Sequence, residues 1–225
     1  MDNPIIVALD VPHLDEAEAL ARDLQGHVGW FKVGLELVAA HGPDAVRAIR
    51  PYGPIFLDVK LHDIPTTVHR AAARFAELDV DLLTVHAAGG PAMVSAAVAG
   101  LGDVGRILAV TVLTSTSDEE LAAMGMDAAH VQVPRLAQLA VRAGSPGLVC
   151  APQDVAEVRR LVGPDVLLVT PGVRPAGAAD QDHARAATPR AALADGADLL
   201  VIGRPITRAD DPVAAAKEIT AGLAS

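Results

Sequence analysis

The sequence is poor in cysteine, in long apolar runs and in basic residues near its start, and each shortage excludes a class of protein. Its 225 residues include one cysteine, Cys150, which cannot form an internal disulfide or a cysteine metal cage. No apolar stretch reaches the roughly 18 residues that cross a bilayer, and no basic segment precedes the first apolar run. We therefore expect a soluble, cytoplasmic protein that does not associate with membranes.

The chain also lacks an excess of positive charge. Its 18 Lys and Arg residues against 28 Asp and Glu leave a formal net charge of −10, which provides no overall attraction to nucleic acid. Binding of an anionic small molecule would require a local cluster of Lys and Arg. Aromatic residues make up only 2% of the chain and hydrophobic residues 51%, so we expect a core of Ala, Val, Leu and Ile.

Eight short apolar runs recur along the chain, rich in Val, Ile and Leu and without polar alternation, as is typical of parallel strands buried on both faces. They are residues 5–9, 30–33, 55–59, 82–85, 107–113, 147–150, 166–169 and 199–202. Amphipathic stretches lie between them, for example residues 14–24, 43–49, 66–78, 131–143 and 155–161. This alternation predicts a single-domain α/β fold, a (β/α)8 TIM barrel over residues 1–225, with a doubly wound open sheet as the alternative.

Polar or small residues follow most of the predicted strands, and this distribution favours the barrel. A barrel gathers its chemistry at the carboxyl ends of many strands, whereas an open sheet gathers it at one switch point. No GxGxxG motif follows the first run, and the strand ends carry Asp10, Lys32, Asp58, Lys60, His86, Thr114, Pro171, Gly172, Gly203 and Arg204. The irregular segment 171–187 is expected to be a loop, either a mobile lid over a ligand or plain surface disorder.

The densest motif is the sequence DVKLHD at residues 58–63, at the end of the third run. Residues two apart on a strand share a face, so Asp58 and Lys60 are expected to point into the barrel mouth, with Asp63 beyond them. Buried charges need partners, and one interpretation is a salt-bridge network that only fastens the rim. Asp10 and Lys32 end neighbouring runs and add two charges to the same mouth, which favours an active site.

A second cluster carries positive charge. Arg204 follows Gly203 after the eighth run, and Arg174 and Gln181 lie in the preceding loop, where such barrels often bind phosphate. The alternative for Arg204 is a solvated surface arginine.

Three other residues are interpreted as structural. His86 is expected to be a hydrogen-bonded rim histidine, His62 to lie behind the charged motif, and Cys150 to be a buried small hydrophobe. No HxH or HExxH pattern points to zinc, whereas magnesium held by Asp residues stays open on composition alone.

Together these segments resemble the orotidine monophosphate decarboxylase family of the bacterial type. The similarity spans the whole chain in order, and its most specific segment is DVKLHDIPTT at residues 58–67. The other matching segments are ALD (8–10), FKVG (31–34), VHAAGG (85–90), LTST (113–116), TPGVR (170–174) and VIGR (201–204). The resemblance implies a (β/α)8 barrel that decarboxylates orotidine monophosphate, a small-molecule nucleotide, in pyrimidine biosynthesis. It also implies a homodimer with shared active sites that uses neither a metal nor an organic cofactor.

The resemblance further implies the catalytic roles. Lys60 would donate a proton and Asp58 would face the substrate carboxylate, while Lys32 and Asp63 would complete an alternating charge array. Asp63 and Thr67 would come from the partner subunit.

The remaining implied roles concern substrate binding. Asp10 and Lys32 would hold the ribose hydroxyls, and Thr114 would contact the pyrimidine, with Ser115, Thr116 and Ser117 as adjacent alternatives. The phosphate would be surrounded by Arg174, Gln181, Gly203 and Arg204.

Two other functions remain open. One is a magnesium-dependent sugar-phosphate decarboxylase or aldolase of the same superfamily, which shares an Asp-x-Lys-x-x-Asp motif. The other is a noncatalytic barrel that binds a phosphorylated metabolite. The continuation of the motif through IPTT at residues 64–67 favours the orotidine enzyme over the first, and the intact Asp58, Lys60 and Asp63 argue against the second.

Overall fold

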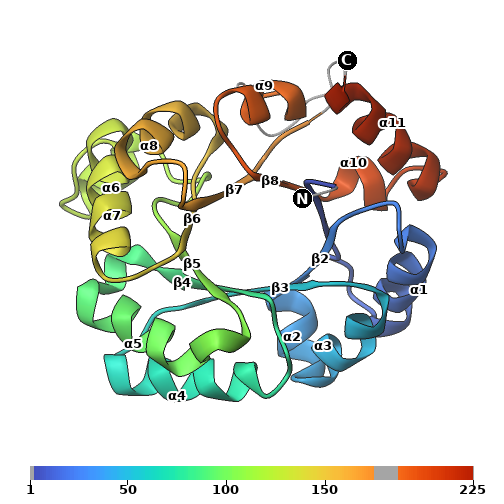
Figure 1. Cartoon of the computed structure of the whole chain (residues 1–225), viewed down its shortest axis with the longest axis horizontal. Coiled ribbons are helices and arrows are strands. Elements are labelled where there is room, and N and C mark those ends of the chain that lie inside the picture. The colour runs from blue at the N-terminus through green and yellow to red at the C-terminus, as the bar shows by residue number, and fades with distance from the viewer. Residues whose placement is uncertain (1–2, 175–186, 225) are drawn as a thin grey trace.

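Eight parallel strands form one closed barrel in chain order, which confirms the predicted fold (Figure 1). The computed structural model describes residues 3–174 and 187–224. The strands are β1 (Ile5–Ala8), β2 (Trp30–Gly34), β3 (Ile55–Leu61), β4 (Leu82–His86), β5 (Arg106–Val110), β6 (Gly147–Val149), β7 (Leu167–Pro171) and β8 (Leu199–Ile202). The open-sheet alternative is wrong, because β1 pairs with both β2 and β8.

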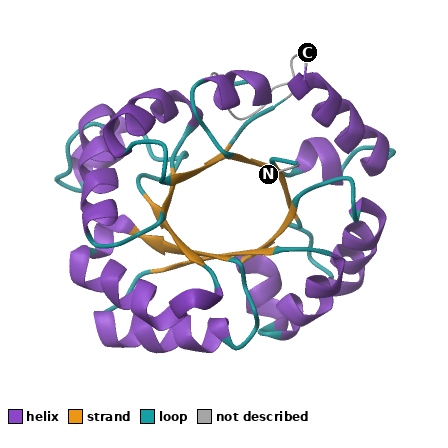
Figure 2. Cartoon of the chain, viewed as in Figure 1, coloured by secondary structure: helices purple, strands orange, loops and turns teal. Residues whose placement is uncertain are grey.

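Helices surround the strands on the outside of the barrel (Figure 2). The α-helices of the described residues are α1 (Leu14–Leu24), α2 (Leu35–His41), α3 (Asp44–Ile49), α4 (Pro65–Ala76), α5 (Pro91–Leu101), α6 (Asp118–Ala123), α7 (Ala129–Arg142), α8 (Val155–Val162), α9 (Pro189–Ala194), α10 (Arg204–Thr207) and α11 (Pro212–Ala224). Among the described residues, some of these elements are connected by four 3-10 turns: η1 (Arg50–Tyr52), η2 (Ala87–Gly89), η3 (Gly102–Val104) and η4 (Pro152–Asp154). No helix within the described ranges is long and apolar enough to cross a membrane.

The strand and helix boundaries differ from the apolar pattern at several ends. The run 107–113 forms a strand only as far as Val110, because the chain bends at Val112; the Thr111 N–H still donates to the Val149 carbonyl of the neighbouring strand β6. The predicted helix 66–78 ends at Ala76, and the chain turns at Asp79, whose φ is +56°. In the other direction β3 continues past Val59 to Leu61, which brings Lys60 into the strand.

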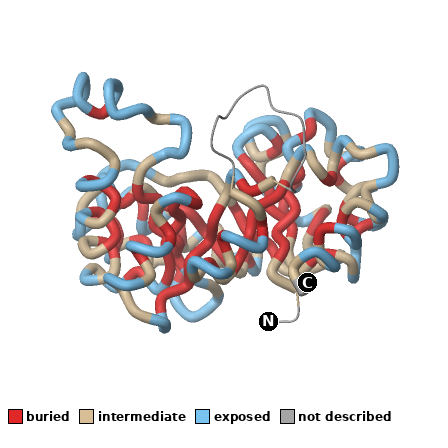
Figure 3. Tube along the Cα trace, turned by 90° about the horizontal axis from the view of Figure 1, so that it is seen from above, coloured by how far each residue is buried: buried red, intermediate tan, exposed pale blue. Residues whose placement is uncertain are grey.

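Two separate apolar cores hold the barrel together. The inner core fills the barrel itself and contains Ile6, Phe56, Leu108, Val169 and Val201 among its buried residues. The outer core lies between strands and helices, where the opposite faces of the strands meet helix residues such as Ala17, Ala72 and Ala137. Alanine on the helices allows close approach to the sheet, as the low aromatic content predicts. Figure 3 shows the buried residues gathered in the interior of the molecule and the exposed residues at its periphery.

Candidate active site

A cavity of about 410 Å³ opens at the carboxyl ends of the strands. Side chains from most of the eight strands, or from the residues that follow them, form its wall, as expected for a barrel enzyme. The lining residues are Ala8, Asp10, Lys32, Phe56, Asp58, Lys60, Val110, Val112, Leu113, Thr114, Val149, Cys150, Pro171, Gly172, Val173, Arg174, Val201, Gly203, Arg204, Pro205 and Thr207. Four lining residues are cationic and two are acidic, so the cavity concentrates positive charge in a chain whose net charge is −10.

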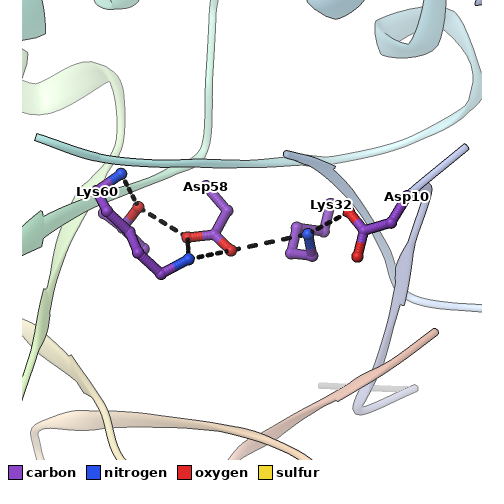
Figure 4. A network of polar contacts seen from close by, with 5 residues as sticks. Asp10, Lys32, Asp58 and Lys60 are labelled. Atoms are coloured by element: carbon purple, nitrogen blue, oxygen red, sulfur yellow. Dashed lines mark hydrogen bonds and ion pairs between the residues drawn. The ribbon is translucent and has the colours of Figure 1, made fainter. Parts of the chain in front are cut away.

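Four charged side chains form a continuous row of alternating sign along one wall of this cavity (Figure 4). Lys32 Nζ lies 2.7 Å from Asp10 Oδ1 and 3.7 Å from Asp58 Oδ2. Lys60 Nζ lies 2.8 Å from both carboxylate oxygens of Asp58. The three strands β1, β2 and β3 are neighbours in the barrel, and this adjacency produces the row from residues far apart in sequence.

Burial gives this row its chemical significance. The side chains of Lys32 and Asp58 are 9% and 14% exposed, and an isolated charge so placed would cost several kcal/mol. Each is compensated because every charge has a neighbour of opposite sign. A fixed, poorly hydrated ammonium facing a cavity acts more strongly on a bound molecule than the same group in water.

The orientation of Lys60 toward the cavity does not result from the regular strand alternation expected from the sequence. Leu57 pairs with Leu83 and Leu61 pairs with Val85, so the interval between the two pairs is four residues long in β3 but only two residues long in β4. Within this irregularity Lys60 has a φ of +49°, in the left-handed region that a lysine rarely occupies. Asp58 and Lys60 do both line the cavity, but the local bulge, and not strand alternation, brings them together.

The predicted phosphate-binding residues lie on the same cavity. Arg174, Gly203 and Arg204 all contribute to its wall. Gly203 precedes α10, with φ −110° and ψ −104°, and Arg204 is the first residue of that helix. Gln181 lies outside the described residues.

Thr114 also lines the cavity, whereas the adjacent alternatives Ser115, Thr116 and Ser117 do not. Ser117 instead caps α6: its hydroxyl accepts from the Glu120 N–H, and the Glu120 carboxylate accepts from the Ser117 N–H. The structure therefore distinguishes Thr114 among four neighbouring polar residues.

Asp63 and Thr67 are exposed and are not part of the cavity wall of their own chain. The Asp63 carboxylate accepts a hydrogen bond of 2.6 Å from the following Ile64 N–H, at the start of α4. The neighbouring Ile64 is a large apolar side chain that is 66% exposed. Within one chain these residues therefore contribute nothing to the cavity.

The three residues interpreted as structural lie close to the site. His86 ends β4, and its ring lies 5.4 Å from that of His62. Burial, followed by the electrostatic effects of His62 and Lys60, lowers the pKa of His86. Cys150 is 1% exposed, and burial raises the pKa of its thiol to about 12. Its interpretation as a buried small hydrophobe is confirmed.

Some residues of the site were not identified from the sequence. Phe56, Val110 and Val149 line the cavity from the inner face of their strands, and their even spacing within the apolar runs was an available signal. Thr84, a single hydroxyl in the apolar strand β4, bonds to both Asp58 and Lys60. Among the residues that the structure describes, no group of three or more His, Cys, Asp or Glu side chains is placed to hold a metal ion.

Comparison with known proteins identifies the family. Residues 3–219 match the model of the orotidine 5'-phosphate decarboxylase / HUMPS family. Proteins named orotidine 5'-phosphate decarboxylase from Anaeromyxobacter sp. (strain K) and from Thermobifida fusca are each 57% identical to this chain. The first alignment covers 97% of both chains, and the second covers 99% of this chain and 97% of the other.

A solved structure supports the same relationship. The crystal structure of orotidine 5'-phosphate decarboxylase from Lactobacillus acidophilus has a TM-score of 0.88 at 37% identity, and the match covers 99% of this chain and all of that one. The similarity in sequence thus extends to the complete barrel. The chain therefore belongs to the orotidine 5'-phosphate decarboxylase / HUMPS family, and it is an enzyme of the carboxy-lyase class.

Proposed function

We propose that this chain converts orotidine 5'-monophosphate to uridine 5'-monophosphate and carbon dioxide, in de novo pyrimidine biosynthesis. The observation that carries the proposal is the row Asp10, Lys32, Asp58 and Lys60 on the wall of a cavity that also contains two arginines. The relatives named above carry the same activity in their names. The chain would act as a single-domain enzyme in the cytoplasm.

The reaction explains why a fixed ammonium is needed. When the bond between the ring carbon and the carboxylate breaks, the electron pair stays on a carbon that has no π-system to accept it. Lys60 Nζ carries three N–H donors and directs two toward Asp58, which leaves a third for the ring carbon. The ammonium stabilises the developing negative charge and then transfers its proton to that carbon.

Asp58 has two roles in this proposal. Its carboxylate orients Lys60, and it lies where the departing carboxylate of the substrate would approach. Repulsion between the two anions would raise the energy of the bound substrate relative to the transition state. Loss of neutral carbon dioxide relieves this repulsion.

The rest of the substrate would be held at the other side of the cavity. Arg174, Arg204 and the backbone at Gly203 suit a phosphate group, with Gln181 as the remaining predicted contact. Asp10 and Lys32 suit ribose hydroxyls, and Thr114 suits the pyrimidine ring. Binding energy at the remote phosphate is available to favour the transition state as well as the substrate.

The proposed active enzyme is a homodimer in which each site receives Asp63 and Thr67 from the partner subunit. Support comes from the exposure of both residues and from the exposed Ile64 between them. In this arrangement Asp63 would extend the row of alternating charge beyond Lys60. No metal or organic cofactor takes part in the proposed reaction.

A decarboxylation assay with orotidine monophosphate, followed by the loss of ultraviolet absorbance, tests the function. We expect the wild-type enzyme to turn over and Lys60→Ala to lose more than the roughly 10²–10⁴-fold that one acid-base group usually contributes. The chain has three lysines, and the third, Lys217, is exposed on α11, so Lys217→Ala is a matched control that should retain activity. Near wild-type turnover by Lys60→Ala would refute the mechanism.

A chelation experiment separates this proposal from the magnesium-dependent sugar-phosphate alternative. Decarboxylation should survive exhaustive treatment with EDTA, because the lysines supply the positive charge that a metal would supply. A sample inactivated by EDTA and restored by magnesium would favour the alternative.

A further inference from the structure

Thr84 lies at the centre of β4 with its side chain in the interior of the barrel. It follows Leu82, a member of the inner core, by two residues, so the two side chains share the inward face. Thr84 is 0% exposed. A hydroxyl at such a depth must find hydrogen-bond partners, and these partners define its role.

The hydroxyl of Thr84 connects the two residues at the reacting end of the charge row. It accepts a hydrogen bond of 2.9 Å from the Lys60 backbone N–H and donates one of 3.0 Å to Asp58 Oδ1. The partners determine these directions, because an N–H only donates and a carboxylate only accepts. The single hydroxyl proton is therefore committed to Asp58.

Both bonds act where the local structure is least regular. Pairing between β3 and β4 is interrupted between Leu57 and Leu61, and Lys60 has its left-handed backbone within this interval. Such a conformation persists only where surrounding contacts hold it. The Thr84 hydroxyl supplies an acceptor for the Lys60 N–H at the point where the regular ladder is broken.

The second bond orients the carboxylate that orients the ammonium. Asp58 Oδ1 accepts from both Thr84 Oγ1 and Lys60 Nζ, and Asp58 Oδ2 also accepts from Lys60 Nζ. Thr84 thus fixes Lys60 twice, through its backbone and through the partner of its side chain. A rotation of either group would displace the ammonium from the reacting carbon.

We infer that Thr84 is a positioning residue that places the Lys60 ammonium for proton transfer without touching the substrate. Thr84 is absent from the cavity wall, so it acts through Asp58 and Lys60. This inference rests on the proposed function, because it assigns Lys60 as the proton donor.

Three variants test the inference. Thr84→Val keeps the shape of the side chain and removes both hydrogen bonds, whereas Thr84→Ser keeps the hydroxyl. Thr111→Val is the matched control: Thr111 is 3% exposed, and its hydroxyl donates to the Val149 carbonyl at 3.1 Å and not to a residue of the charge row. Thr84→Ala removes the same hydroxyl with less bulk and takes the place of Thr84→Val should that variant not fold.

The readout is kcat and KM for orotidine monophosphate, with the active-site concentration determined by titration with a tight-binding nucleotide inhibitor. We expect Thr84→Val to lose about 100-fold in kcat, the order of loss that a displacement of about 1 Å produces, with KM changed less than threefold. Thr84→Ser and Thr111→Val should stay within about threefold of the wild-type kcat. A merely structural role would lower the active-site concentration and leave kcat per site unchanged.

Several results would overturn the inference. An unchanged kcat per site in Thr84→Val would show that the hydroxyl is not needed, and an equal loss in Thr84→Ser would show that the methyl group matters instead. A loss confined to KM would assign Thr84 to substrate binding. A wild-type enzyme without turnover in the same assay would refute the proposed function itself, whereas active wild type with active Thr84→Val would refute only the role of Thr84.

Discussion

Cys150 forms part of the cavity wall, yet its thiol is unsuited to nucleophilic chemistry. Burial, together with the negative charge of Asp154, raises its pKa to about 12. The thiolate is the reactive form of cysteine, so a thiol of this pKa stays protonated and inert near neutral pH. Cys150 is therefore not a candidate nucleophile for chemistry in the cavity.

Alkylation by iodoacetamide measures this inertness, because the chain has no other cysteine. The shift from the ordinary value of 9.0 to about 12 predicts a rate in the native protein at pH 8 that is roughly 1000-fold below that in urea. Mass spectrometry of timed samples gives both rates. Equal rates in the native and unfolded protein would contradict the burial of Cys150.

Gly34 leaves space for the first pair of the charge row. A Cβ atom at this position would lie 2.8 Å from Asp10 Oδ1 and 2.9 Å from Lys32 Nζ. Its φ of −99° suits any residue, so the requirement for glycine is one of space alone.

We expect Gly34→Ala to separate Asp10 from Lys32 and to raise the KM for orotidine monophosphate roughly tenfold, in line with the cost of overpacking a tight site. Steady-state kinetics provide the measurement. Gly222→Ala is the control, since a Cβ there would meet no atom within 4 Å. Gly34→Ala with the kinetic constants of Gly222→Ala would show that the pair tolerates displacement.

At the scale of an element, β3 shows how a local irregularity brings two charged side chains together. Its first residues Ile55, Phe56 and Leu57 are buried and pair regularly with β2. Between Leu57 and Leu61, β3 contains two more residues than the matching part of β4. These residues change the direction of the carboxyl end of β3, so that Lys60 approaches Asp58. Such bulges re-aim side chains near active sites.

Asp154 ends the turn η4 and directly precedes helix α8, and among the described residues it is the one carboxyl group with a clearly raised pKa. Burial, with a smaller effect from Glu157, raises the pKa of Asp154 from 3.8 to about 6. The folded state therefore binds this proton more tightly than the unfolded state. Its contribution to stability is greatest below about pH 4 and is lost as the pH rises toward 6.

Asp154→Asn removes the cost of ionising this half-buried group. We expect the free energy of unfolding at pH 7.5 to rise by about 1 kcal/mol, after a discount for partial solvent exposure, and the gain to vanish near pH 3.5. Urea denaturation at both values measures it. A gain of equal size at both would mean that ionisation of Asp154 is not its cause.

At the scale of the whole molecule, an acidic chain presents a cationic cavity. Two of its three lysines and two of its arginines line the cavity at the mouth of the barrel, against a net charge of −10. This placement suits an anionic ligand such as a nucleotide. Assembly is the remaining question at this scale, because Asp63 and Thr67 do not reach the cavity of their own chain.

Subunit complementation tests the shared site. If the enzyme is the homodimer proposed above, Lys60→Ala and Asp63→Ala dimers should each be inactive, but a heterodimer of the two contains one site with both residues intact. We expect mixing under conditions of subunit exchange to restore activity to as much as half of the wild-type value per heterodimer. Heterodimers verified by mass spectrometry that remain as inactive as the parents would place Asp63 within its own barrel.

Much of the fold followed from the one-dimensional pattern. The eight apolar runs predicted the strands because parallel strands of a barrel are buried on both faces. Such strands can be recognised from their own sequence without knowing which strands they pair with. The motif at residues 58–67 and the polar strand ends identified Asp10, Lys32, Asp58 and Lys60, since a barrel brings all its strand ends to one mouth.

The contacts within the site were decided by tertiary structure alone. The bulge in β3 exists only relative to the register of β4, and the bonds of Thr84 join residues 24 and 26 positions away in sequence. A prediction from strand alternation assumes that each strand is regular and ignores its neighbours. It therefore gives neither the left-handed backbone of Lys60 nor the hydrogen bond between Lys60 and the buried Thr84 hydroxyl. The sequence by itself determined which charges reach the barrel mouth, and the packing of β3 against β2 and β4 decided their order and their distances, because hydrogen bonds between strands depend on register.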